Sequence, residues 1–318
     1  MKIVTPDATN TLNAKDLSAM SFQPIKYVVP GVIVEGLTLL AGKPKIGKSW
    51  LLLHAAVAVA RGGFTLGDIH CKEGDVLYCA LEDNPRRLQS RLRKLIGTTE
   101  PWPPRLNFLC EMPRLTEGGL ATVKGWIEAA EQPRLVIIDT LAMVRTPKKR
   151  DESNYDGDYS AVKDLRNLAH EAGVAIVLVH HLRKADADDA FDTVSGTLGL
   201  TGAPDTILVL KRDTSGNIAL HGRGRDLVEL EKAVSFNKEA CTWTIMGDAH
   251  EIRLSGERRT ILQALTEAGE PLGPNTIATA TGMKATNVRR LLLKLLRDGE
   301  IKKAGYGKYL PIETRKDP

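Results

Sequence analysis

The segment that most constrains the fold is an eight-residue run in which glycines, a lysine and a serine stand at fixed spacing. It is Gly42-Lys-Pro-Lys-Ile-Gly47-Lys48-Ser49, which matches the phosphate-binding pattern G-x-x-x-x-G-K-[ST] without a substitution. Glycines at these places let backbone N–H groups curl around phosphate oxygens, and a following helix adds partial positive charge at its N-terminus. The pattern therefore calls for a strand, a tight loop and a helix in that order.

The flanks of this loop have the composition that this order needs. Residues 37–40, Leu-Thr-Leu-Leu, predict a buried parallel strand, and residues 50–61, rich in Ala, Leu and Val, predict a helix. In such a loop Lys48 reaches the β- and γ-phosphates of a nucleotide, and the Ser49 hydroxyl binds Mg²⁺. An ordinary glycine-rich turn is the alternative. The residues expected to hold the nucleotide are Gly42, Lys43, Pro44, Lys45, Ile46, Gly47, Lys48, Ser49 and Trp50.

Apolar runs alternate with amphipathic segments from about residue 31 to residue 210. Alternation of this kind predicts an α/β fold, with a mostly parallel sheet and helices on both faces. Shorter segments up to residue 245 are typical of antiparallel hairpins at the edge of that sheet. The strand candidates are Leu37–Ala41, Asp75–Ala80, Leu106–Leu109, Leu135–Ile138, Ala175–Val179 and Thr206–Leu210, and the helix candidates include Pro85–Ile96, Leu120–Ala130 and Tyr159–Ala172.

The hydrophobic pattern changes near residues 247–256, where we expect a domain boundary. Helices are predicted at Glu257–Ala268, with Ser255 as N-cap, at residues 273–282 and at Lys284–Arg297, followed by a hairpin at Ile301–Leu310. Three helices and a hairpin are typical of a winged helix-turn-helix. The expected organisation is an N-terminal extension (1–23), a nucleotide-binding domain (24–248), the winged helix-turn-helix (255–312) and a tail (313–318).

Positive charge is concentrated at the C-terminal end. Residues 255–318 hold 12 Lys and Arg against 7 Asp and Glu, a surplus equal to the net charge of +5 of the 318-residue chain. Such a surplus favours a polyanion partner, although a basic tail without a partner would have the same composition. A winged helix can also serve in protein docking or in oligomerisation, which is the alternative to DNA contact. The side chains expected to contact DNA here are Asn287, Arg289, Arg290, Lys294, Lys302, Lys303 and Lys308.

Other features limit the class of protein. The sequence has no apolar run of 18 residues, and residues 1–16 are polar, which argues against a membrane span and a signal peptide. The four cysteines are scattered without a C-x-x-C pair. We therefore expect reduced thiols, no zinc site and a cytoplasmic location.

Two predicted strands end in carboxylates. The run Leu-Val-Ile-Ile-Asp139 places Asp139 at the carboxyl end of a strand, where α/β sheets bind ligands and where a carboxylate can hold Mg²⁺ at a nucleotide. The run Val-Leu-Tyr-Cys-Ala-Leu-Glu82 ends in Glu82 and Asp83. We expect Glu82 to activate the water that attacks the γ-phosphate. The alternative is that these acids only cap the next helix, a role that suits Asp83.

Histidine and arginine candidates follow later in the chain. The strand at residues 175–179 continues into two histidines, and the imidazole of His180 is a candidate sensor of the γ-phosphate, with a structural histidine as the alternative. Arg223 and Arg225 lie in a strand-like segment. Guanidinium groups can stabilise charge on a transferring phosphoryl group, often from a neighbouring subunit. The alternative for both is a surface ion pair with Asp226 or Glu229.

Together these segments resemble the RecA-like ATPases of the plasmid RepA helicase type, over about residues 24 to 245. The resemblance rests on four runs: Val-Pro-Gly-Val-Ile-Val-Glu-Gly-Leu-Thr-Leu-Leu-Ala-Gly-Lys-Pro-Lys-Ile-Gly-Lys-Ser-Trp50, Ala-Leu-Glu-Asp83, Val-Ile-Ile-Asp-Thr140 and Val-His-His-Leu-Arg-Lys184. It implies a RecA fold and a ring, expected to be hexameric, with ATP bound between subunits. The chain departs from that family in its appended winged helix.

The resemblance also implies how the residues divide within such a ring. Lys48, Ser49, Glu82 and Asp139 would lie on one side of the ATP, and Arg223 and Arg225 would act as fingers from the next subunit. Loops at residues 144–158 and 182–200 would face the ring channel. Their DNA-contacting side chains would be Lys148, Lys149, Arg150, Arg183 and Lys184.

The sequence therefore predicts a DNA-associated ATPase of a mobile element, phage or plasmid that uses ATP and Mg²⁺. Its expected work is ATP-driven translocation on single-stranded DNA as a replicative helicase. One alternative is an ATP-gated assembly without unwinding, such as a recombination mediator, a helicase loader or a regulatory ring. Another is a DNA-binding regulator in which ATP only sets the oligomeric state.

Overall fold

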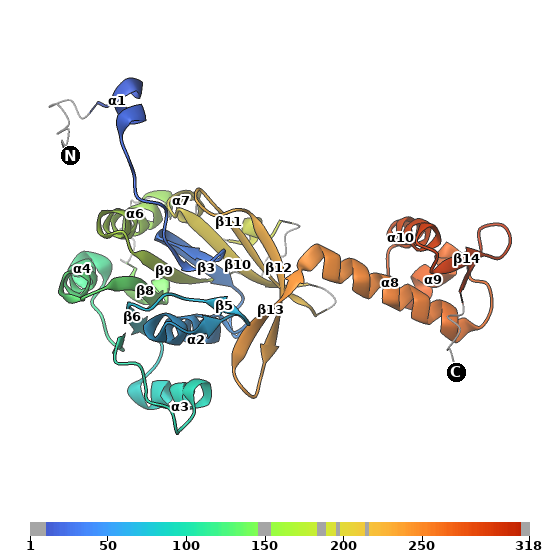
Figure 1. Ribbon diagram of the computed structural model, residues 1–318, viewed down its shortest axis with the longest axis horizontal. Coiled ribbons are helices and arrows are strands. Elements are labelled where there is room, and N and C mark those ends of the chain that lie inside the picture. The colour runs from blue at the N-terminus through green and yellow to red at the C-terminus, as the bar shows by residue number, and fades with distance from the viewer. Residues whose placement is uncertain (1–10, 146–153, 183–188, 195–197, 214–215, 313–318) are drawn as a thin grey trace.

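The chain folds around one large mixed sheet (Figure 1). The computed structural model describes residues 11–145, 154–182, 189–194, 198–213 and 216–312, and of residues 154–161 and 198–199 the backbone alone. Among these residues, nine strands form the sheet in the order β13-β12-β11-β10-β3-β9-β8-β6-β7. They are β3 (Gly36–Gly42), β6 (Asp75–Ala80), β7 (Leu106–Leu109), β8 (Pro133–Asp139), β9 (Ala175–His181), β10 (Thr206–Arg212), β11 (Ile218–Gly224), β12 (Leu230–Asn237) and β13 (Thr242–Asp248).

The central part of the sheet is parallel and its far edge is antiparallel. The six strands from β10 to β7 run parallel to their neighbours, whereas β11, β12 and β13 are added as antiparallel hairpins. The central strands are apolar in their middle parts on both faces, because helices cover both faces of the sheet. The predicted α/β class is confirmed, and each of the six predicted strands is present.

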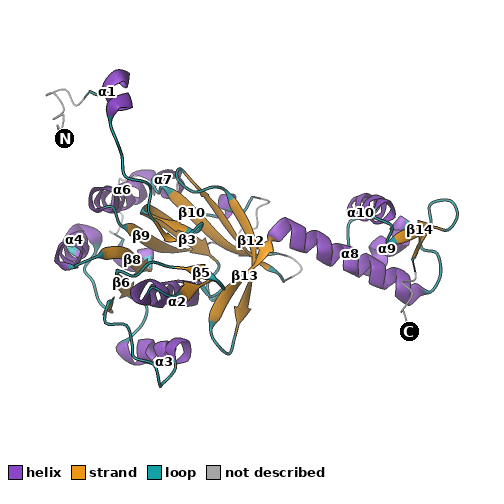
Figure 2. Ribbon diagram, viewed as in Figure 1, coloured by secondary structure: helices purple, strands orange, loops and turns teal. Residues whose placement is uncertain are grey.

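Helices lie on both faces of the sheet (Figure 2). The helices α2 (Lys48–Arg61) and α3 (Pro85–Ile96) pack against one face, and α4 (Gly119–Ala129) and α6 (Asn154–Ala172) pack against the other. Helix α2 is rich in alanine and leucine, is almost fully buried, and ends at Gly62 in the left-handed conformation. The shorter elements are α1 (Ala14–Ala19), α5 (Leu141–Val144), α7 (Leu198–Gly202), the hairpin β1 (Tyr27–Val29) and β2 (Ile33–Val34), and the hairpin β4 (Phe64–Thr65) and β5 (Ile69–His70).

The C-terminal unit consists of three helices and a hairpin. These are α8 (Ala249–Ala268), α9 (Pro274–Thr281), α10 (Ala285–Arg297), β14 (Ile301–Lys303) and β15 (Tyr309–Pro311). Its apolar side chains form a hydrophobic cluster of their own, separate from the two clusters that flank the sheet. The predicted helix-turn-helix with a following hairpin is therefore present, with boundaries within a few residues of those predicted, except at its start.

The start of α8 differs from the prediction. The sequence pattern places the helix start at residue 257 with Ser255 as its cap, but the helix begins at Ala249, directly after the last strand of the sheet. The cap is Asp248, whose carboxylate accepts hydrogen bonds from the backbone N–H groups of His250 (3.0 Å) and Glu251 (3.2 Å). Gly256 lies inside the helix, where a glycine is tolerated at a cost of about 1 kcal/mol.

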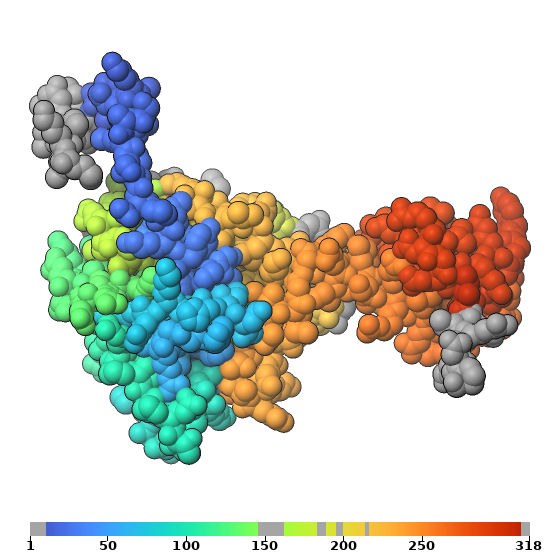
Figure 3. Space-filling model, viewed as in Figure 1, coloured from blue at the N-terminus to red at the C-terminus, as the bar shows by residue number. Residues whose placement is uncertain are grey.

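The two ends of the described chain extend away from the sheet. Figure 3 shows the C-terminal unit joined to the body through α8, and α1 on an arm at the opposite side. Helix α1 buries none of its residues. No helix within the described residues is both long and apolar enough to cross a membrane.

Candidate functional site

The phosphate-binding loop leaves the carboxyl end of β3 and turns directly into α2. Gly47 has φ 106°, a conformation that favours glycine, and Lys45 also has positive φ (61°). A Cβ at Gly42 would stand 2.9 Å from the Leu210 carbonyl oxygen of the neighbouring strand β10. The two glycines of the motif are thus needed for different reasons. Gly42 allows the close approach of β10 to β3, and Gly47 allows the turn into α2.

Trp243 supports the loop from β13. Its indole Nε1–H donates to the Gly47 carbonyl oxygen at 3.1 Å, and a Cβ at Gly47 would lie 2.8 Å from the indole ring. The side chain is almost fully buried. The sequence analysis missed this residue because it approaches the loop from the antiparallel edge, almost 200 positions later in the chain.

Lys48 is buried at the centre of the site. Its Nζ donates to the carbonyl oxygens of Gly42 (2.7 Å) and Lys43 (3.1 Å), and it lies 3.1 Å from His181 Nδ1. Burial lowers the pKa of Lys48 to about 8, although the carboxylates of Asp139 and Glu82 oppose the shift. The carbonyl oxygens of the first two loop residues thus hold the ammonium group in the loop, where it would contact a bound phosphate.

Asp139 ends β8 and is buried next to the start of α2. Tyr78 donates its hydroxyl to Asp139 Oδ2 at 2.9 Å, and the same hydroxyl lies 3.5 Å from the Ser49 carbonyl oxygen. Burial and the Asp139 charge raise the pKa of Tyr78 well above its ordinary value, so the phenol stays a donor. The sequence analysis missed Tyr78 because it stands within an apolar strand and resembles an ordinary core residue.

The surroundings of Asp139 and Ser49 fit Mg²⁺. The Tyr78 hydroxyl bonds to Oδ2 of Asp139 and so orients this carboxylate beside the start of α2. A hydroxyl and a single carboxylate are the oxygen donors that Mg²⁺ takes beside nucleotide phosphates. Within the described part of the chain no group of three or more His, Cys, Asp or Glu side chains forms a metal cage.

Glu82 follows the end of β6 and is half exposed. Its Oε1 accepts a hydrogen bond from Thr140 Oγ1 at 3.2 Å and lies 3.7 Å from His181 Nε2. The carboxylate therefore stands beside the same histidine that contacts Lys48. Its position, at the rim of the site and open to solvent, is suitable for contact with a water molecule.

The next residue, Asp83, does not cap α3, which was the alternative role considered for it. The cap is Asn84, whose side-chain oxygen accepts from the Arg87 backbone N–H at 2.9 Å. Asp83 forms ion pairs with Arg87 (2.6 Å) and Arg91 (2.5 Å) instead. The guanidinium carbon of Arg91 stands 4.5 Å from the ring centroid of Trp50 on α2, so this chain of contacts ties the Glu82 segment to the phosphate-loop helix.

The two histidines at the end of β9 face opposite sides of the sheet, since neighbouring residues of a strand alternate. His181 pairs with Gly42 in the sheet register, and it is His181 that contacts Lys48 and Glu82. His180 pairs with Ala41, which belongs to the hydrophobic cluster of the other face. His180 is the histidine predicted from the sequence, but His181 is the one that lies beside the phosphate loop.

Arg223 and Arg225 lie away from their own phosphate loop. Arg223 is on β11, forms an ion pair with Glu229 (2.8 Å), and stacks with its guanidinium carbon 4.3 Å from the Phe191 ring centroid. This hydrogen bond to Glu229 raises the pKa of Arg223. Arg225 Nη1 stands 3.7 Å from Asp205 Oδ1. The side chains of both arginines remain more than half exposed.

The cations of the C-terminal unit are mostly at its surface. Arg289 donates to Asn275 Oδ1 (3.2 Å) and Arg290 to Asn287 Oδ1 (2.9 Å). Lys294 is half-buried, and Lys302, Lys303 and Lys308 are exposed on the hairpin. The predicted loop cations Lys148, Lys149, Arg150, Arg183 and Lys184 lie outside the described residues.

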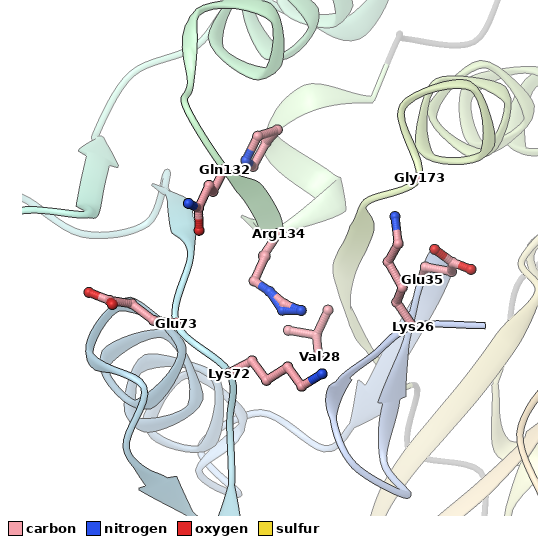
Figure 4. A pocket seen from close by; sticks show the side chains of 9 residues that line it. Lys26, Val28, Glu35, Lys72, Glu73, Gln132, Arg134 and Gly173 are labelled. Atoms are coloured by element: carbon pink, nitrogen blue, oxygen red, sulfur yellow. The ribbon is translucent and has the colours of Figure 1, made fainter. Parts of the chain in front are cut away.

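A pocket of about 380 Å³ lies at the opposite edge of the sheet, where the parallel strands begin (Figure 4). Lys26, Glu35, Lys72 and Arg134 project around it. Its charges are mixed, and it includes none of the residues selected from the sequence. The candidate site is therefore the carboxyl edge, with Lys48, Asp139 and Glu82 together.

Two protein families match the chain in separate parts. The AAA domain family matches residues 5–187, which is more than half of the chain. The IclR helix-turn-helix domain family matches residues 260–304, in agreement with the C-terminal unit.

The chain is also similar to curated DNA repair proteins. It is 27% identical over 182 residues to the DNA repair protein RadA of Streptococcus pneumoniae, covering 56% of this chain and 36% of that protein. It is 27% identical over 191 residues to the DNA repair protein RadA of Mycobacterium tuberculosis, covering 60% of this chain and 35% of that protein. The chain thus spans little more than a third of the length of these relatives.

Two solved structures share the fold. One is an ATPase domain, with a TM-score of 0.50 at 15% identity, covering 66% of this chain and 84% of that one. The other is a DnaB-like replicative helicase, solved in a study of its interactions with primase, with a TM-score of 0.51 at 15% identity, covering 68% and 58%. At this identity the likeness establishes a RecA-like fold.

Proposed function

The chain belongs to the AAA domain family, and on that basis we propose that it is an ATP-driven DNA translocase. It works as a ring of identical subunits, expected to be hexameric, on single-stranded DNA. Its process is replication of a plasmid, phage or other mobile element, as in the plasmid RepA type of helicase. The proposal rests on one observation. Lys48, Asp139 and Glu82 lie close together at one edge of a RecA-like sheet.

The residues at this edge have separate roles in the proposed hydrolysis of ATP. The backbone N–H groups of the loop and the Lys48 ammonium hold the β- and γ-phosphates. Asp139 and the Ser49 hydroxyl would hold Mg²⁺, which neutralises charge on the phosphate oxygens. Glu82, beside His181, accepts a hydrogen bond from the attacking water and orients it.

The position of the arginines supports a ring. Gly224, next to Arg225, pairs with Thr206, and Thr206 pairs with Thr38, four residues before Gly42 on β3. Arg225 is one residue further along, so at about 3.3 Å per residue it lies roughly 17 Å from its own phosphate loop along the strand, beyond the reach of a side chain. We therefore assign Arg223 and Arg225 to the ATP site of the next subunit.

DNA contacts are assigned to two regions. Lys148, Lys149, Arg150, Arg183 and Lys184, which lie outside the described residues, are proposed to line the ring channel. The exposed cations of α10 and of the β14–β15 hairpin are proposed to contact phosphates of duplex DNA, with Asn287 and Arg290 nearest to base edges.

A second function, a DNA-associated mediator, loader or regulatory ATPase without unwinding, is favoured by two observations. The chain is similar to DNA repair proteins over 56% to 60% of its length. The helix-turn-helix unit on α8 gives the chain a second DNA-contacting region outside the proposed channel.

The test is steady-state ATP hydrolysis without DNA, with single-stranded DNA and with duplex DNA, using Lys48→Ala as the blank. We expect strong stimulation by single strands if the chain is a translocase, and a strand-displacement assay then measures unwinding. Slow turnover that is indifferent to all DNA would rule out the translocase and leave the regulatory function.

A further inference from the structure

A buried carboxylate at the amino edge of the sheet has no part in the proposed phosphate site. Asp205 stands directly before β10 with a side chain only 3% exposed. Its Oδ2 accepts from the Leu37 backbone N–H (3.0 Å) and from His170 Nε2 (2.9 Å), and its Oδ1 accepts from Arg166 Nε (2.9 Å). The same Oδ1 lies 3.7 Å from Arg225 Nη1.

The surroundings of Asp205 keep it ionised. Burial alone would raise its pKa, but the Leu37 N–H, His170 and Arg166 outweigh burial and hold the pKa below its ordinary value. The opposing Gly36 has φ 96°, and a Cβ there would stand 2.9 Å from Asp205 Oδ2. The absence of a side chain at residue 36 thus makes room for the carboxylate.

Asp205 joins three segments of the chain. Leu37 is the second residue of the strand β3, which leads into the phosphate loop, and Arg166 and His170 are one turn apart on α6. Arg225 is joined to the same residue by its backbone, because its N–H donates to the Asp205 carbonyl oxygen at 2.9 Å. The Asp205 N–H in turn donates to the Leu37 carbonyl oxygen, also at 2.9 Å.

We propose that Asp205 is a positioning residue that fixes Arg225, and with it the end of β11, in register with the phosphate-loop strand. This inference rests on the proposed function, in which Arg225 serves the ATP site of the next subunit. A shift of β3 or α6 on nucleotide binding then moves Arg225 in the same subunit. Because Arg225 is more than half exposed and 3.7 Å from Oδ1, it can leave the carboxylate for a phosphate.

The chain offers a matched control at the same edge. Asp75, at the start of β6, is also a buried carboxylate, and it accepts from Arg105 Nη1 (3.1 Å) and from the Gln132 backbone N–H (2.6 Å). It lies on the side of β3 opposite to β11 in the strand order. Asp75→Asn thus removes a comparable charge without changing any contact to Arg225.

The experiment is a double-mutant cycle of Asp205→Asn and Arg225→Ala in the full chain, with ATP turnover and the affinity for an ATP analogue measured separately. We expect Asp205→Asn to lower kcat about tenfold and to change analogue affinity less than about twofold. In the Arg225→Ala background, the same substitution should lower kcat by less than about twofold. Asp75→Asn should leave kcat unchanged in both backgrounds, even where it lowers Tm.

Two outcomes overturn the inference in distinguishable ways. If Asp205→Asn lowers kcat by the same factor in both backgrounds, or not at all, Asp205 does not act through Arg225. If Arg225→Ala itself leaves kcat unchanged, the proposed shared site fails, and the role of Asp205 fails with it. Should Asp205→Asn fold poorly, His170→Ala removes one donor to Asp205 from α6. It should lower kcat two- to threefold, about the size of one lost link in a coupled set, and this loss should disappear in the Arg225→Ala background.

Discussion

Cations in the phosphate loop and cations in the C-terminal unit are held in opposite ways. Lys48 is 4% exposed, is bonded to two carbonyl oxygens, and has its pKa lowered to about 8 by burial. Arg289, Arg290 and the hairpin lysines stand at the surface. The effect of a buried charge depends on its exact position, and salt screens it little. The effect of exposed charges on a polyanion depends on how many there are, and salt screens it. The two regions should therefore respond differently to substitution, salt and pH.

The largest effect is expected at the phosphate-loop edge. Glu82→Gln keeps the size and a hydrogen-bond acceptor for Thr140 but removes the charge that orients the attacking water. We expect kcat to fall about a hundredfold or more, with analogue binding kept within about twofold. Glu231→Gln, on β12 and away from the site, is the control. Turnover close to that of the wild type would assign the role of Glu82 to another residue.

In the C-terminal unit, each substitution should have a smaller effect, and the quantity that changes should be the affinity for duplex DNA. Replacing Arg289, Arg290 and Lys294 by alanine should weaken duplex binding about tenfold or more at low salt. The slope of log affinity against log salt should fall by about 0.9 for each phosphate that the variant no longer neutralises. ATP turnover without DNA should not change. A variant that binds duplex normally, with the same salt slope, would indicate that this unit docks a protein instead.

The buried lysine should make stability depend on pH. Lys48 loses its proton near pH 8 in the folded protein and near 10.5 in the unfolded chain. Between these values the unfolded chain binds more protons, so folding stability rises with pH across this window. At pH 7 the buried charge lowers stability, and Lys48→Met should raise the free energy of unfolding of the nucleotide-free protein by about 1–3 kcal/mol.

This stabilisation should fade as the pH approaches 10.5, because the wild-type lysine is then increasingly neutral in both states. Denaturant melts at about pH 7 and about pH 10 measure the difference. Lys45→Met, at an exposed lysine of the same loop, is the matched control for the loss of a loop lysine. An equal effect of Lys48→Met at both pH values would contradict the account of a desolvated ammonium group.

The smallest effect is expected at Trp243, whose indole packs against the phosphate loop. Trp243→Phe keeps most of the ring that covers Gly47 and removes the Nε1–H donor to its carbonyl oxygen. We expect a decrease of about 1 kcal/mol in stability and a two- to fivefold weaker binding of ATP analogue. Trp126→Phe on α4, which packs against the other hydrophobic cluster, controls for the removal of an indole. A wild-type affinity in Trp243→Phe would show that the loop holds its shape without the strand β13.

The motifs at strand ends could be predicted because each is a local pattern. Gly42 to Ser49, Asp139 and Glu82 are defined by residues next to one another in the chain, and parallel strands bring their carboxyl ends to one edge. His181 could have been chosen over His180 from the alternation of β9, since it shares the parity of Val177 and Val179, which pack on the α2 face.

The remaining contacts could not be predicted, since they depend on register between distant segments. Trp243 reaches Gly47 from the antiparallel edge of the sheet, and Asp205 reaches Leu37 and Arg166 through the parallel pairing of β10 with β3 and the packing of α6. The predicted start of α8 was wrong because Gly247 and Gly256 together resemble a linker, whereas the Asp248 cap continues the chain from strand to helix without a break.

The central claim, an ATP site shared between neighbouring copies, is tested most directly by mixing two inactive variants. Lys48→Ala cannot use its own phosphate loop but offers its arginines, and the double variant Arg223→Ala, Arg225→Ala has an intact loop but offers none. Each alone should be inactive, and an equal mixture should recover about a quarter of wild-type turnover, because about one interface in four joins an intact loop to intact arginines. A mixture that co-assembles and remains inactive would contradict the account.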